Sequence, residues 1–143
     1  MNRNVFAGLA AVLVAVGGYV FWPTPVPVIV VDKPVDDDAI VSVILPEHLS
    51  ATDQLGERAY EATCAACHGE NGVGRDGRGP PLVHKIYEPS HHGDFAFERA
   101  VQLGVRSHHW PFGDMPPQTD VTIADVKAIV SYVRTLQRAN GIE

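Results

Sequence analysis

The sequence predicts an all-α domain that follows one N-terminal transmembrane helix. Three observations support this: apolar residues recur at helical spacing behind N-cap signals, no strand pair or repeat is convincing, and a long uncharged apolar run lies near the N-terminus. We divide the 143 residues into a transmembrane helix at 1–22, a Pro- and Asp-rich extended linker at 23–50, and a folded domain at 51–143.

The composition excludes two broad classes of protein. The chain has 11 Lys and Arg against 17 Asp and Glu, which gives a net charge of −6. It contains no basic tract of the kind that a nucleic-acid binder needs. Only two cysteines are present, so a scaffold built on several disulfides is also excluded.

The uncharged run from Val5 to Trp22 has the length of a membrane span. As a helix it would extend roughly 27 Å, close to the ~30 Å of a bilayer's hydrocarbon core. Arg3 precedes it, so we expect a cytoplasmic N-terminus and export of everything after the span. The alternatives are a cleaved signal peptide, which would also export the rest of the chain, and a buried core helix.

The linker opens with Pro23, Pro25 and Pro27, a density that favours extended chain. Fully extended, it would reach about 85 Å. Its apolar stretches, Val28–Val31 and Ile40–Leu45, are expected to pack on the domain or on a partner as short strands.

Three helices are predicted in the domain from their starting signals. Ser50 with Asp53, and Thr122 with Asp125, have the spacing of capping boxes, and Asp94 is a candidate N-cap. The second helix covers 95–103 and is followed by a glycine, as is typical of a helix end. The predicted apolar stripes are Leu55, Ala59, Ala62 and Ala66 in the first helix, and Ile123, Val126, Ile129, Val130 and Val133 in the third.

Cys64-Ala65-Ala66-Cys67-His68 has the Cys-x-x-Cys-His pattern by which c-type haem is attached. Two thiols at this spacing can bond the two vinyl groups of the porphyrin, and the adjacent histidine can ligate the iron. Thioredoxin-like redox chemistry would need a βαβ context, and a structural zinc site would need about four ligands. A disulfide between the two cysteines would leave His68 unexplained.

Met115 is the candidate second axial ligand. It is the only internal methionine, and two prolines follow it in a polar loop between the second and third helices. Such a loop is a poor place for a core residue, and the prolines would hold the sulfur in place. A His/Met pair raises the reduction potential of a haem relative to two histidines.

Residues 51–143 resemble a class I cytochrome c. Gly56, Tyr60 and Cys64 match the family's Gly-x-x-x-aromatic-x-x-x-Cys helix, and residues 79–82 match its Gly-Pro-x-Leu loop. Tyr132 matches the aromatic residue of the last helix that crosses the first helix.

This resemblance implies a fold wrapped around one covalently bound haem c. It implies that the Pro80 carbonyl accepts a hydrogen bond from His68 and that Leu82 packs on the haem. Tyr60 and Trp110 are further candidates for the haem environment.

The histidine-rich middle of the domain departs from the family's usual pattern. The pairs His91-His92 and His108-His109 flank the second helix and have the side chains of a copper, zinc or nickel site. Other interpretations remain open. The histidines can serve structure alone, or His108 or His109 can replace Met115 in some states. Alternatively one of them, or a residue from the set Trp110, Arg75, Arg78 and Lys85, can bond a haem propionate.

We therefore expect a membrane-tethered cytochrome that shuttles single electrons and is not an enzyme, since six-coordinate iron leaves no site for a substrate. Its domain would face the periplasm from the bacterial inner membrane. By family analogy its partners would be respiratory or photosynthetic complexes, such as a bc-type complex or a terminal oxidase. The alternatives are an electron-relay subunit of a larger oxidoreductase complex, and a copper- or redox-linked protein that uses the histidine pairs.

Overall fold

In the computed structural model of this protein, the structure describes residues 37–143. The predicted transmembrane helix and residues 23–36 of the predicted linker lie outside the described residues. Within the described part, no helix has both the length and the apolar character needed to cross a bilayer.

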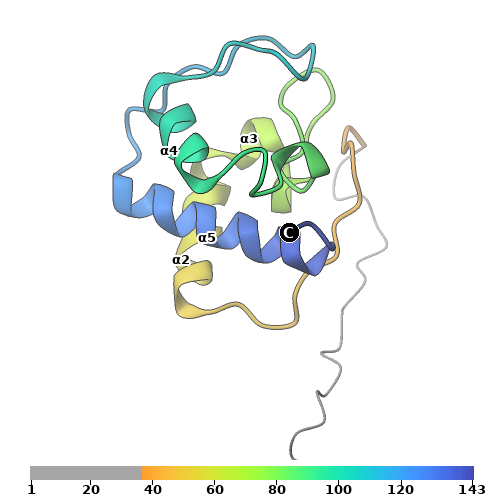
Figure 1. Ribbon diagram of the computed structural model, residues 1–143, viewed down its shortest axis with the longest axis vertical. Helices are drawn as coiled ribbons and strands as arrows, with labels where there is room; N and C mark the ends of the chain where they lie inside the picture. The colour runs from red at the N-terminus through yellow and green to blue at the C-terminus, as the bar shows by residue number, and fades with distance from the viewer. Residues whose placement is uncertain (1–36) are drawn as a thin grey trace, which may run out of the picture.

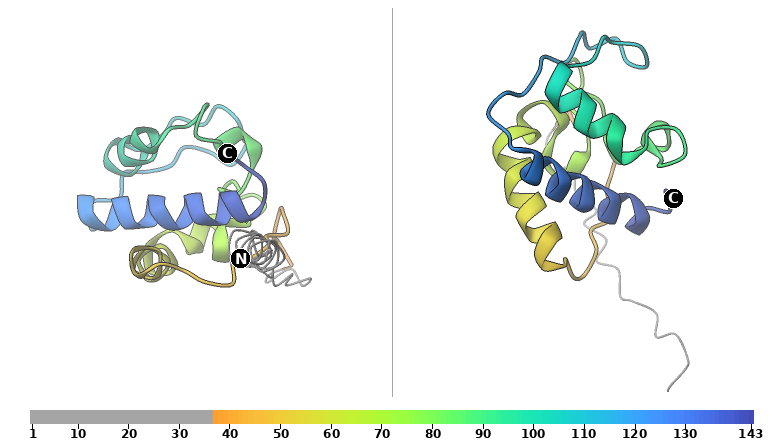
Figure 2. Two further views of the ribbon diagram at one scale, coloured as in Figure 1. Left: turned by 60° about the horizontal axis from the view of Figure 1, so that its bottom comes forward. Right: turned by 60° about the vertical axis from the view of Figure 1, so that its left-hand side comes forward.

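The described chain is helical, as predicted, and forms only isolated β-bridges in place of strands. The helix α5 lies between α2 and α4, and the two 3-10 turns and the short α3 connect the longer helices (Figures 1 and 2). In chain order the elements are α2 (Ala51–Thr63), α3 (Ala65–His68), η1 (Glu70–Gly72), η2 (Lys85–Tyr87), α4 (Asp94–Leu103) and α5 (Ile123–Ala139).

Both predicted capping boxes are present. Ser50 caps α2 and Thr122 caps α5, and in each case the aspartate three residues later bonds back to the cap. The prediction that Asp94 is an N-cap is wrong. Gly93 takes that position without a side-chain bond, and Asp94 is the first helical residue. Its carboxylate instead accepts a hydrogen bond of 2.8 Å from Nε of Arg134 on α5.

The helices α2 and α5 cross in close contact at Gly56. A Cβ at this position would lie 2.0 Å from the carbonyl oxygen of Ala128 and 2.9 Å from the Cβ of Tyr132. Since real side chains do not approach so closely, only glycine permits this crossing. The rings of Tyr60 and Tyr132 then pack with their centroids 5.8 Å apart, and both side chains are buried.

The buried faces differ in part from the predicted stripes. In α2 the buried residues are Asp53, Gly56 and Tyr60, whereas Leu55 is 56% exposed. In α5 the stripe is confirmed except at Ile123, which is 42% exposed. The physical reason in α2 is that the close crossing selects a small residue at the interface, so the apolar side chains beside it lie off the buried face.

The described end of the predicted linker packs on the domain. The backbone amides of Ile40 and Val41 both donate to the carbonyl of Val73, and Val43 is buried in the core. The side-chain amide of Asn140 bonds both backbone polar groups of Ile44 at 2.8 and 2.9 Å. The stretch 40–45 thus contacts the domain itself, the first of the two alternatives raised above, but the prediction that it forms a short strand is wrong: its backbone makes a few isolated bonds to the domain and no ladder.

Candidate functional site

The helix α3 places the two cysteines and the histidine of the Cys-x-x-Cys-His motif in one helical turn. Cys64 ends α2 and also caps α3, and its carbonyl accepts hydrogen bonds from the amides of Cys67 at 3.1 Å and of His68 at 2.9 Å. The two cysteines are not joined by a disulfide. Cys64 is partly buried and Cys67 is exposed.

His68 is held in one tautomer. Its Nδ1 lies 2.8 Å from the carbonyl oxygen of Pro80. A carbonyl can only accept a hydrogen bond, so Nδ1 carries the proton and Nε2 keeps its lone pair. Burial lowers the pKa of His68, and the bond to Pro80 offsets part of that effect. The ring is therefore neutral at pH 7 and presents Nε2 as a metal ligand.

The chemistry of the cysteines differs from that of a redox-active thiol pair. The pKa of the Cys64 thiol is raised to about 11, mainly by burial and to a smaller extent by repulsion from Cys67 and Glu61. Disulfide oxidoreductases require a thiolate and therefore a lowered thiol pKa. The Cys64 thiol is therefore poorly suited to thiol–disulfide exchange.

The loop that follows α3 is fixed against the helices by two tyrosines. The hydroxyl of Tyr60 donates to the carbonyl of Gly69 at 3.0 Å, and the hydroxyl of Tyr132 donates to Oδ1 of Asn71 at 2.8 Å. These bonds connect the α2–α5 crossing to the segment that carries Pro80. Tyr60 therefore supports the site through the backbone.

Further along the same loop, Gly79 lies directly on α3. A Cβ there would be 2.5 Å from the carbonyl oxygen of Cys67, so glycine lets Pro80 approach His68. Leu82 is buried in the core, and its carbonyl accepts a bond of 2.8 Å from the side chain of Gln137.

Met115 comes from a separate segment, a hairpin closed by residues 105 and 115. Gly104 ends α4 with φ of 74°, a conformation that residues with a Cβ rarely adopt, and a Cβ there would lie 2.5 Å from the Met115 carbonyl oxygen. Val105 and Met115 then exchange two backbone hydrogen bonds of 2.9 Å. Figures 1 and 2 show this segment at the end of the domain away from the start of α2.

Trp110, in the same hairpin, has a buried indole N–H with no hydrogen-bond partner among the described residues. The side chain of Tyr87 lies close by. Burial raises the pKa of Tyr87 to about 12, and the neighbouring Trp110 offsets part of that rise. The two groups do not have the geometry of a hydrogen bond. A buried donor without an acceptor is costly, so this N–H is suited to a carboxylate of a bound group.

Besides His68 the chain has six histidines, and the structure brings four of them together. His91, His92, His108 and His109 form one cluster, with ring centroids of neighbouring members 4.2 to 6.1 Å apart. The pKa of His109 is lowered, mainly by reduced hydration and to a smaller extent by repulsion from the other three rings. Two histidines lie elsewhere: His84 caps η2 through its side chain, and His48 is exposed beside Glu47.

Two buried polar residues of α5 were not singled out from the sequence as parts of the site. The guanidinium of Arg134 donates to the carbonyls of Tyr87 and His92 and to the side chain of Gln137. The available signal was the position of these two residues beside buried apolar neighbours in the helix.

The donor set fits a covalently attached haem. It comprises two cysteines outside any disulfide, a neutral imidazole with a free Nε2, and a buried N–H without a partner among the described residues. The comparisons with known proteins agree: the family model for cytochrome c matches residues 54–137, a range that contains every one of these groups. The comparison with curated proteins gave no match.

Proposed function

The chain belongs to the cytochrome c family, and from this premise we propose that it carries single electrons between membrane-bound redox complexes. Haem c is covalently attached to its cytochrome c domain, and the role of that domain is haem-based electron transfer. The proposal adds the number of haems, the ligand set, the location and the class of partner.

The residues have the following proposed roles. Cys64 and Cys67 would hold the haem through two thioether bonds, and His68 and Met115 would ligate its iron. When bound, the haem supplies an iron that gains and loses one electron. Trp110 donates its buried N–H to a propionate, and Pro80 orients the imidazole of His68.

The observation that carries the proposal is the bond of 2.8 Å between His68 Nδ1 and the Pro80 carbonyl. It leaves Nε2 as the only nitrogen free for a metal, and it joins the attachment motif to the loop that the family resemblance singled out. A ring held in this way would change little in position when the iron that it binds changes charge, as rapid electron transfer requires.

Two side-chain ligands leave no open coordination position, so we propose that the protein is not itself an enzyme. The reduced holoprotein is then expected not to bind carbon monoxide. If it does bind carbon monoxide, an axial position is open, and a catalytic function replaces electron carriage as the better proposal.

We also propose that residues 1–22 anchor the protein in the bacterial inner membrane, with the cytochrome domain in the periplasm. The partners would be a bc-type complex and a terminal oxidase, or their photosynthetic counterparts. Since residues 40–45 pack on the domain, the tether is shorter than the predicted linker. A tether keeps the domain near its partners and raises its effective concentration there.

A potentiometric optical titration of the holoprotein, produced with the machinery that attaches c-type haem, tests the ligand set. The oxidised wild type is expected to show the far-red band of methionine-ligated haem and a high potential. Met115→Leu, which is similar in volume, should lose the band and have a lower potential.

Asp114→Asn is the matched control, because it changes the neighbouring exposed residue and keeps the sulfur. It should retain the band. Loss of the band in both variants, or in neither, would contradict the assignment of Met115 as a ligand. Stable co-purification with a larger complex would favour the relay-subunit alternative over a shuttle.

A further inference from the structure

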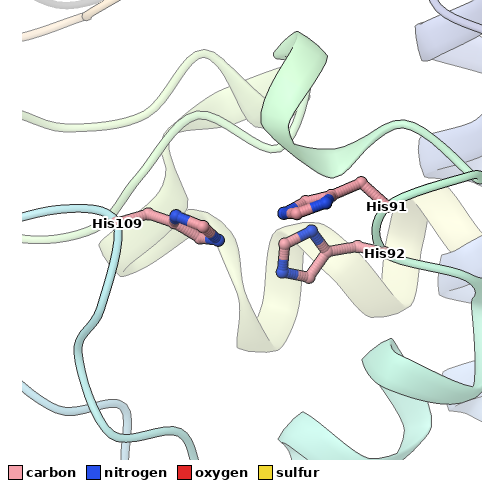
Figure 3. A group of neighbouring side chains, drawn as sticks. All are labelled: His91, His92 and His109. Carbon is pink, nitrogen blue, oxygen red and sulfur yellow. The ribbon is translucent and has the colours of Figure 1, made fainter.

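The histidine cluster has the composition and arrangement of a metal site apart from the haem-attachment motif. One ligand nitrogen each of His91, His92 and His109 lies within 4.8 Å of the other two. Figure 3 shows the rings of His91 and His92 side by side, with the ring of His109 directed at them from another loop. No acidic side chain belongs to this group among the described residues, so its donors are all imidazole nitrogens.

One half of the cluster is attached to a rigid part of the domain. Nδ1 of His92 donates to the carbonyl of Ile86 at 2.7 Å, which leaves Nε2 free as a ligand. The carbonyl of His92 itself accepts a hydrogen bond from Arg134, which is 7% exposed and pairs with Asp94. Ligand histidines in metalloproteins are oriented by bonds of this kind.

The other half of the cluster lies in the hairpin of residues 105–115. His108 donates from Nδ1 to the carbonyl of Arg106 at 2.8 Å, so its Nε2 is also free. Its ring centroid is 4.2 Å from that of His109. The amide of Ser107 donates to the Asp114 carboxylate at 2.8 Å, which closes the hairpin loop around the two histidines.

We propose that His91, His92 and His109 bind a divalent transition-metal ion, that Cu²⁺ is the ion bound most tightly, and that His108 can complete the coordination. Imidazole is a good ligand for copper, zinc and nickel, and at a given nitrogen site Cu²⁺ has the highest affinity of the divalent ions. Bound metal would join the loop before α4 to the hairpin of residues 105–115.

The spacing of the nitrogens is compatible with this assignment after small side-chain movements. With bonds of about 2.0 Å, neighbouring ligand nitrogens lie roughly 3 Å apart around a metal ion. The nitrogens here are within 4.8 Å of one another, so the rings need to close by less than about 2 Å. His91 and His109 are exposed, and rotation about their side-chain bonds can supply this movement.

The test is a titration of the oxidised, detergent-solubilised full-length holoprotein with CuCl₂, NiCl₂ and ZnCl₂. Calorimetry gives the stoichiometry and affinity, and electron paramagnetic resonance gives the copper ligands. We expect one Cu²⁺ per chain, bound at least tenfold more tightly than Ni²⁺ or Zn²⁺, with splitting from three or more nitrogens.

His91→Gln and His109→Gln remove one imidazole each while keeping a polar side chain. Each should weaken Cu²⁺ binding at least tenfold and reduce the nitrogen splitting, and the double variant should abolish the site. The matched control is His48→Gln, because His48 is exposed and lies outside the cluster. It should bind Cu²⁺ as the wild type does.

Three results would overturn the proposal: no binding of Cu²⁺ at millimolar concentration, unchanged binding in both cluster variants, or equal loss in the His48 control. Binding of Zn²⁺ or Ni²⁺ as tight as that of Cu²⁺ would overturn the assignment to copper. The haem spectrum of every variant serves as the check on folding. This site does not require Met115 to be a haem ligand, so its test is independent of the ligand test above.

Discussion

Replacing Gly56 by alanine tests the close crossing of α2 and α5 on which the site is built. The added Cβ would lie 2.0 Å from the carbonyl oxygen of Ala128, whereas ordinary contacts begin at 3.4 Å. The obstructing atom belongs to the backbone and cannot rotate away. The two helices must therefore separate by about 1.4 Å at this point, which weakens the contacts between Tyr60 and Tyr132.

Two opposing effects set the expected size of the change. Alanine has a higher helix propensity than glycine by about 1 kcal/mol. Overpacking costs about 1–3 kcal/mol and occasionally more, and a backbone clash belongs at or above the upper end of that range. We expect a net loss of about 2 kcal/mol in the free energy of unfolding, which corresponds to a fall in Tm of roughly 8–16 °C for a domain of this size.

The assay is denaturant unfolding of the holoprotein, with midpoints compared at equal m-values. Gly93→Ala is the matched control. Gly93 has φ of −62°, and the nearest atom to its added Cβ, the carbonyl oxygen of Pro89, is 3.6 Å away. The control should lose less than about 1 kcal/mol, as is usual for an N-cap glycine. If Gly56→Ala is as stable as the control, the argument from close crossing is refuted.

Two further predictions concern buried polar residues that connect the helices. The carboxylate of Asp53 accepts bonds from Ser50 and from Ser131 on α5; these outweigh the desolvation that opposes them and lower its pKa. Asp53→Asn should lower the free energy of unfolding by about 1–2 kcal/mol at pH 7. The pKa of Asp53 is lower in the folded state than in the unfolded state, so the difference between variant and wild type should shrink as the pH falls below about 4. Acid unfolding of both proteins measures this difference. Arg134→Met leaves the His92 carbonyl without its Arg134 donor, while the Tyr87 carbonyl keeps the bond from the side chain of Gln137; the change should lower the free energy of denaturant unfolding by about 1–3 kcal/mol. Asp94→Asn, at the exposed end of the same ion pair, should cost less than about 1 kcal/mol, and equal losses would contradict the buried role of Arg134.

Features decided within one helical turn were well predicted from the sequence. The capping boxes at Ser50 and Thr122 depend on groups three residues apart, so the residues themselves specify the bonds. The same is true of Cys64, Cys67 and His68, which share one turn of α3. The haem-attachment motif was therefore recognisable without any knowledge of the fold.

Predictions about which face is buried were less successful. Leu55 and Ile123 were assigned to the core by periodicity, and both are exposed. Periodicity identifies a helix face that is rich in apolar residues, but the neighbouring helix decides which face is covered. In α2 the required partner contact is a glycine, which adds nothing to an apolar stripe.

The sequence by itself determined that this chain contains a c-type haem motif, three helices, two of them closed by capping boxes, and two histidine pairs. The family resemblance had already implied the bond from His68 to the Pro80 carbonyl. Only the tertiary structure decided that Arg134 holds the loop of His92 and that the two histidine pairs meet in one cluster. The physical reason is the range of the interactions. A cap or a Cys-x-x-Cys-His turn is closed by bonds within a few residues, whereas these later contacts join segments whose approach depends on the crossing of α2 and α5 and on the path of every loop between them.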